Sequence, residues 1–181
     1  MSIALIHINA ATRSASDVKA GYSDELLIAE YGNFLSVKGP VGGGAPGASK
    51  MITASHTFPA GEGYTELRGK IGSTGADGES IGEAGGGVMK YKPKVAVVGD
   101  GAIQCEYIEN LLNKEVMVLA GAPDCDSTNP YAQYGGKCSV CIVTKVTFKS
   151  GSKNSGGLKE YELEFETFDK YFYVGTVTKK S

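Results

Sequence analysis

The chain has 181 residues, which suits a single domain, and 41% of them are apolar, so a sizeable core can form. A net charge of -2 excludes a general nucleic-acid binder, because such proteins carry a basic surplus. The 26 glycines are about twice the usual share and predict many turns and long loops.

The N-terminal part begins with a short strand-like run, "IALIHIN" (3–9), inside a polar segment that we expect to form an arm over 1–24. Its first residues lack the basic region and the apolar length of a signal peptide. No run approaches the roughly 20 apolar residues of a membrane span. We therefore expect no membrane partner and synthesis as a soluble protein in a cytoplasm.

The next apolar run, 25–37, predicts a strand or a strand that bends at Gly32. It is followed by a segment over 38–50 so rich in glycine and proline that we expect a flexible loop. Two further strand candidates, 51–58 and 64–71, are separated by the turn-forming residues "PAGEG".

A second glycine-rich segment, 72–87, has seven glycines among sixteen residues and predicts a long, mobile, acidic loop. The strand signal returns over 88–98, where Pro93 indicates a sheet edge or a break in pairing. One convincing helix follows over 101–114, with Asp100 as its expected cap. Its predicted apolar face consists of Ile103, Tyr107, Ile108, Leu111 and Leu112.

Strands are also predicted over 115–120, 137–149 and 158–168, with a loop over 121–136. The last run, 170–177, either continues the sheet or belongs to a C-terminal arm over 169–181. Seven or eight strands joined mostly by hairpins favour antiparallel pairing. The expected fold is one mainly β domain over 1–181, a β-sandwich or partly open barrel flanked by one helix, with long glycine-rich loops.

The segment "YELEFETF" (161–168) alternates acidic and apolar residues, which is typical of a strand with one buried face. Tyr161, Leu163 and Phe165 form its apolar face. The four residues of the opposite face, which we call the glutamate ladder, are Glu160, Glu162, Glu164 and Glu166.

The preceding strand alternates in the same way. Strict alternation places Val140, Ile142, Val146 and Phe148 on one face, and Cys141, Val143, Lys145, Thr147 and Lys149 on the other. In a hairpin, Lys145 and Lys149 can then pair with some glutamates, which leaves a surplus of two negative charges. This pattern is typical of an ordinary solvated sheet face, and the alternative is a channel wall that repels DNA phosphates.

Strand, Gly99-x-Gly101, helix and strand follow one another as in a nucleotide-binding βαβ unit. The dinucleotide fingerprint requires a third glycine where Gln104 stands, so this remains an alternative: a small-ligand or nucleotide-binding β domain. The sequence contains no Gly-x-Ser-x-Gly nucleophile elbow, no His-Glu-x-x-His zinc-protease motif and no cysteine beside a histidine. We therefore expect neither an enzyme nor a bound cofactor.

The residues that could bind metal do not form a complete site pattern. "DCDSTN" (124–129) starts like a calcium loop but lacks its glycine and its final glutamate. Among Cys105, Cys125, Cys138 and Cys141, the last two are three residues apart on a predicted strand and would face opposite sides of it. His7 and His56 each lie alone in a strand-like run, where packing is the usual role. We therefore expect no metal site.

The order of elements from 56–102 through 108–124 to 159–168 resembles the tail tube proteins of tailed bacteriophages and the related inner tubes of contractile injection systems. The resemblance rests on this layout. It implies a β-sandwich or barrel-like pair of sheets with one flanking helix, self-assembly into hexameric rings, and stacking of the rings into a hollow tube. The segments 1–50 and 170–177 depart from the family pattern in length.

The resemblance further implies a virion protein of the tail that contacts other tail proteins and lets DNA pass without specific binding. On this basis the expected lumen-facing residues are Glu160, Glu162, Glu164, Glu166, Lys145 and Lys149. The expected inter-subunit residues of the glycine-rich loops are Gly42, Gly43, Gly44, Asp77, Glu79 and Glu83. The glycine-rich loops would become ordered only against neighbouring subunits.

Overall fold

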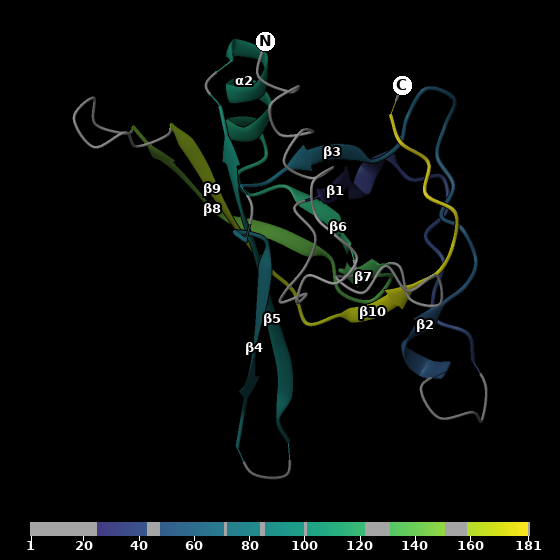
Figure 1. The fold of residues 1–181 in the computed structure, drawn as a ribbon. Coiled ribbons are helices and arrows are strands. Elements are labelled where there is room, and N and C mark those ends of the chain that lie inside the picture. Colours follow the sequence, from purple (N-terminus) through teal and green to yellow (C-terminus); the bar gives the residue numbers. More distant parts are fainter. Residues whose placement is uncertain are drawn as a thin grey trace, which may run out of the picture.

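Alternating apolar residues produce strands along most of the chain in the computed structural model (Figure 1). The structure describes residues 25–42, 48–70, 72–83, 86–99, 101–121, 131–150 and 159–180. The expectations for the arm 1–24, His7, Gly43, Gly44, Asp100, the calcium-like residues 124–129 and Cys125 lie outside the described residues. Within them the fold is mainly β with one α-helix, which confirms the predicted class.

The strands are β1 (Glu25–Glu30), β2 (Met51–Ile52), β3 (Thr65–Arg68), β4 (Gly75–Ile81), β5 (Val88–Val98), β6 (Glu115–Gly121), β7 (Tyr131–Tyr134), β8 (Cys141–Lys149), β9 (Glu160–Glu166) and β10 (Lys170–Tyr173). The helix is α2 (Ala102–Asn110), and short 3-10 helices cover Tyr31–Asn33 and Ala48–Lys50. The predicted bend at Gly32 therefore takes the form of a helical turn that ends β1.

All ten strands belong to one sheet, in the order β2-β10-β7-β6-β8-β9-β5-β4, with β1 and β3 attached to the free side of β6. Pairing is antiparallel except between β10 and β2, so the sheet is mixed and is not a closed barrel. The segment expected to be a possible C-terminal arm thus starts with a strand inside the sheet, between β7 and β2.

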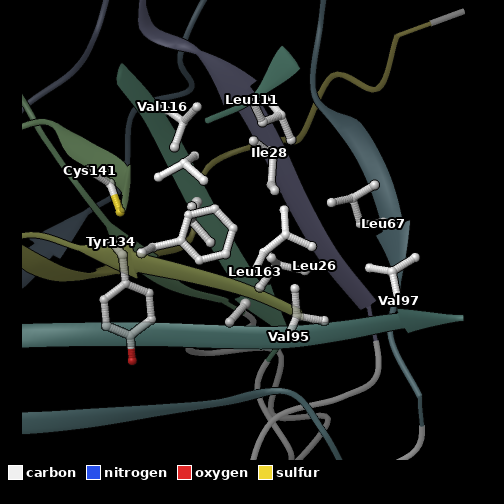
Figure 2. Close-up of a cluster of buried hydrophobic side chains, with 14 of the residues drawn as sticks. Leu26, Ile28, Leu67, Val95, Val97, Leu111, Val116, Tyr134, Cys141 and Leu163 are labelled. Carbon is white, nitrogen blue, oxygen red and sulfur yellow. The ribbon is translucent and has the colours of Figure 1, made fainter. Parts of the chain in front are cut away.

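The main core lies where the β1–β3 side of the sheet faces the β8–β9–β5 side (Figure 2). Leu26 and Ile28 of β1, Val95 and Val97 of β5, and Leu163 of β9 meet there. A second cluster packs on the opposite face of β1, β6 and β10, and the segments 34–42, 48–64 and 174–180 cover it. These two clusters hold the sheet in its bent shape.

Helix α2 is shorter than predicted, and its apolar face is narrower. Ile108 and Leu111 are buried in the main core, whereas Ile103 is 86% exposed and Leu112 is also exposed. The expectation that all five apolar residues pack together is therefore wrong. The helix contacts the sheet at both ends: Gln104 Nε2 donates a hydrogen bond to the Val98 carbonyl (3.4 Å), and Tyr161 Oη donates one to Glu109 (2.8 Å).

Pro93 lies inside β5, between two partner strands, and interrupts one of the two pairings. Backbone hydrogen bonds join Tyr91 to Thr167 of the β9 side, and the regular ladder with β9 resumes at Lys94. In a strand, the backbone N–H groups of residues 91 and 93 face the same partner, which here is the β9 side. Proline has no N–H, so position 93 cannot donate a hydrogen bond to β9. The predicted break is therefore a local gap in the β5–β9 ladder.

Candidate assembly surface

One face of the four strands β8, β9, β5 and β4 carries the glutamate ladder, and on the opposite face β9 and the adjoining parts of β8 and β5 pack on the core. Tyr161, Leu163 and Phe165 are buried, as predicted, and the glutamates that alternate with them are only partly covered. Because the other face of β9 and of the adjoining parts of β8 and β5 packs on the core, the ladder face is the surface that these strands turn away from the protein body. We call this four-stranded surface the ladder face.

Every glutamate of the ladder is matched by a lysine. Two of the lysines come from β8, as predicted, and two come from outside the hairpin. The four pairs are Glu160 with Lys70 (3.3 Å), Glu162 with Lys149, Glu164 with Lys145 (2.7 Å) and Glu166 with Lys90 (2.5 Å). The hairpin's predicted surplus of two negative charges is thus compensated by Lys70 and Lys90, which sequence reasoning missed because both are distant in the chain.

The same face continues onto β4 and β5 with two more ion pairs. Asp77 accepts from Lys94 (2.8 Å), and Glu79 accepts from Lys92 (2.5 Å). The hydrogen bond from Lys92 lowers the pKa of Glu79, and its counterpart raises the pKa of Lys92. All these groups are exposed, so each pair contributes little to the stability of the single chain.

The charges are arranged in columns that alternate in sign from strand to strand. Acidic residues occupy β4 and β9, and lysines occupy β5 and β8. One outermost column, on β4, is therefore acidic, and the other, on β8, is basic.

A β-bulge in β8 changes which residues face the core. The pairing with β9 shifts between Val143 and Lys145, so that Thr144 is an extra residue. Before the bulge Val143 is fully buried and Ile142 is 41% exposed on the ladder face. After the bulge Val146 packs against the core. The prediction that Ile142 shares a face with Val146, and Val143 with Lys145, is therefore wrong.

The segment 72–87, expected to be a mobile loop, contains strand β4 and forms a hairpin with β5. Asp77 and Glu79 are strand residues opposite Lys92 and Lys90, and Glu83 lies exposed at the far end. Figure 1 shows this β4–β5 hairpin reaching well beyond the other strands.

Two sheet edges on either side of the ladder face have backbone groups available for pairing. Among the described residues, β4 pairs with β5 alone. On β8, the β6 strand and the turn after α2 engage the backbone as far as Val143. Beyond that point, Lys145–Lys149 pairs with β9 alone in the described part of the chain.

The strand-to-helix turn at Gly99 does not have the geometry of a nucleotide site. Strand β5 pairs with β4 and β9, while β6 pairs with β1, β7 and β8, so the two strands around α2 are not parallel neighbours. The Gln104 side chain lies directly against Gly99, 2.4 Å from the position a Cβ would take. It fills the space in which a phosphate would contact the turn.

The other residues singled out from the sequence, a glycine, a histidine and two cysteines, lie in the following surroundings. Gly42 lies exposed with open space around it. His56 is buried, accepts a hydrogen bond from the Lys38 N–H at Nδ1 (3.0 Å), and bonds Gln133 through Nε2 (2.9 Å). Burial lowers the pKa of His56. Cys141 is buried, and burial raises the pKa of its thiol to about 12, whereas Cys138 is exposed.

Within the described ranges, no group of three or more histidine, cysteine or acidic side chains is placed to hold a metal ion. In the same ranges, no helix has both the length and the apolar character needed to cross a membrane.

Comparison with known proteins gives two similar structures. No protein-family model matches the chain, and no curated protein matches it. One similar structure is from the virion of a native gene transfer agent particle, with 17% identity, a TM-score of 0.42, and coverage of 60% of this chain and 88% of that one. The other is from the anti-feeding prophage baseplate, with 8% identity, a TM-score of 0.39, and coverage of 88% and 98%. Both TM-scores lie below 0.5, so this likeness by itself assigns neither family nor function.

Proposed function

We propose that this protein is a structural subunit that assembles with copies of itself into rings, and that the rings stack into the hollow tube of a phage tail. The observation that carries the proposal is the four-stranded ladder face, whose edges at β4 and Lys145–Lys149 pair with no further strand in the described part of the chain. Exposed edges attract further strands, and soluble proteins normally block them. Here β4 and Lys145–Lys149 each pair on one side only among the residues that the structure describes.

The directions of the strands favour a head-to-tail joint between copies. Because β8, β9, β5 and β4 are successively antiparallel, β4 and β8 run in opposite directions. When a second copy is placed beside the first in the same orientation, its β8 meets β4 in an antiparallel arrangement, which suits regular pairing. Head-to-tail joints of this kind close into rings or continue as helices.

The charges select the same joint. Pairing of β4 with β4 of another copy would place Asp77 and Glu79 against acids, and pairing of β8 with β8 would place lysines against lysines. Like charges directly across a strand pair are unfavourable. A β4–β8 joint instead extends the alternation of acidic and basic columns across the boundary between copies.

In such a ring the ladder face lines the lumen, because on the opposite side β9 and the adjoining parts of β8 and β5 pack on the core. The wall then presents lysines and acids that already neutralise one another rather than a surplus of free acids. Transient passage of DNA needs a surface without unpaired lysines that would hold phosphates. The six-fold ring, the contacts with other tail proteins, the place in the virion and synthesis in the host cytoplasm belong to this proposal.

Electron microscopy and sedimentation velocity of the purified chain over a range of concentrations test the proposal. Rings or tubes are expected, together with a sedimentation coefficient that rises with concentration. A chain that remains monomeric at high concentration, without particles in the micrographs, would overturn it. The variant Ile103→Ser, altered on the exposed side of α2, serves as a control that should still assemble.

A further inference from the structure

The far end of the β4–β5 hairpin carries apolar side chains that nothing in the described structure covers. Ile81 and Val88 are directly opposite each other on the ladder face, and both are exposed. Met89, on the other side of the ribbon, is exposed as well. A two-stranded ribbon is marginally stable by itself in water, and exposed apolar groups on such a projection mark a contact site.

A hollow elsewhere on the protein is partly lined by apolar side chains, like the tip of the hairpin. Its walls include three apolar side chains, Val140, Ile142 and Phe168, with Cys138 and Lys137 beside them. Ile142 and Phe168 are large apolar residues that remain more than 40% exposed. The hollow therefore offers apolar surface to apolar side chains of a partner.

The two features lie on opposite sides of the ladder face and extend in the same direction along the strands. Asp77 is opposite Lys92, Lys94 is opposite Glu164, and Ile142 is opposite Glu166, so Asp77 and Ile142 fall in the same row. The hairpin tip continues beyond Asp77, and the hollow continues beyond Ile142. In a β4–β8 joint between copies, the tip of one copy runs beside the hollow of the next.

The charges next to the apolar groups are complementary. Glu83 is exposed at the hairpin tip, Lys137 is exposed at the hollow, and neither forms an ion pair with another described residue. Within one chain the hairpin runs beside its own β9, where Tyr91 bridges Thr167 and Lys90 pairs with Glu166, and Ile81 and Val88 project past this last bridge. The complementary charges and the projecting apolar tip favour the hairpin of another copy as the occupant of the hollow.

We propose that the tip of the β4–β5 hairpin, with Ile81 and Val88, docks into the Val140–Ile142–Phe168 hollow of a second copy of this chain. This inference rests on the proposed head-to-tail assembly and specifies its contact. It makes the joint directional, because each copy contributes a tip on one side and a hollow on the other.

The native Cys138 at the hollow allows a direct test by cross-linking. In a chain with Cys105→Ser and Cys125→Ser, the added substitution Val88→Cys should yield disulfide-linked dimers and a series of higher multiples with oxidised glutathione. The matched control Ile103→Cys, on exposed helix surface, should give no such series. Rings without cross-links, or a cross-link formed within a single chain, would overturn the docking inference while leaving the assembly proposal intact.

A charge exchange gives an independent test with the folded state preserved. Glu83→Lys should raise the protein concentration needed for half-assembly by about three- to tenfold, as expected for reversal of one exposed charge pair. Combination with Lys137→Glu should restore assembly. Equal assembly of the single variant, or failure of rescue, would count against the docking contact. If even the unaltered chain never assembles, the proposed function fails as well.

Discussion

The bulge in β8 leads to a prediction about two adjacent residues. Val143 is fully buried and Ile142 is 41% exposed, whereas strict alternation would place Ile142 with Val146 on the core side. Threonine keeps the β-branched shape that strands favour, so substitution by threonine tests burial with little change in strand propensity. In Val143→Thr a hydroxyl replaces a methyl group inside the main core.

A hydroxyl buried without a hydrogen-bond partner costs about 1–3 kcal/mol in proteins, so we expect Val143→Thr to lower the free energy of unfolding by about 2 kcal/mol. In Ile142→Thr the hydroxyl reaches water, and the loss should stay below about 1 kcal/mol. Urea unfolding at low protein concentration measures both values. With a slope of about 2 kcal/mol per molar, the midpoint of Val143→Thr should fall by about 1 M. A larger loss for Ile142→Thr than for Val143→Thr would refute the bulge.

Three further predictions concern pH, assembly and close backbone contact. Burial lowers the pKa of His56, so His56 binds a proton more readily in the unfolded chain than in the folded one. The free energy of unfolding should therefore fall as the pH drops below 6.5. His56→Gln should flatten the dependence of the free energy of unfolding on pH between pH 7 and 5.5. Asp77→Lys combined with Glu79→Lys should prevent ring formation in sedimentation velocity while leaving the circular dichroism spectrum unchanged, and normal rings would argue against the β4–β8 joint. Gly63→Ala should lower the melting temperature, because its Cβ would lie 2.7 Å from the backbone of Lys179, and an unchanged melting temperature would contradict that contact.

The sequence by itself determined the strands whose two faces differ clearly. The alternation in 161–165 fixed the buried face of β9, and the run 88–98 fixed the bounds of β5, because a period of two requires an extended chain with one side covered. Pro93 correctly indicated a gap in pairing. The pairing of Lys145 with the glutamate ladder also followed from the hairpin, since both strands are close in sequence.

The tertiary structure decided the features that depend on distant partners. Strand β4 forms in a glycine-rich segment because β5 supplies its hydrogen bonds, which local composition does not show. The bulge at Thr144 adds a residue opposite β9, and it reverses the alternation that the sequence suggests. Lys70 and Lys90 complete the charge pairs from elsewhere in the chain, because sheet order, and not sequence distance, brings side chains together.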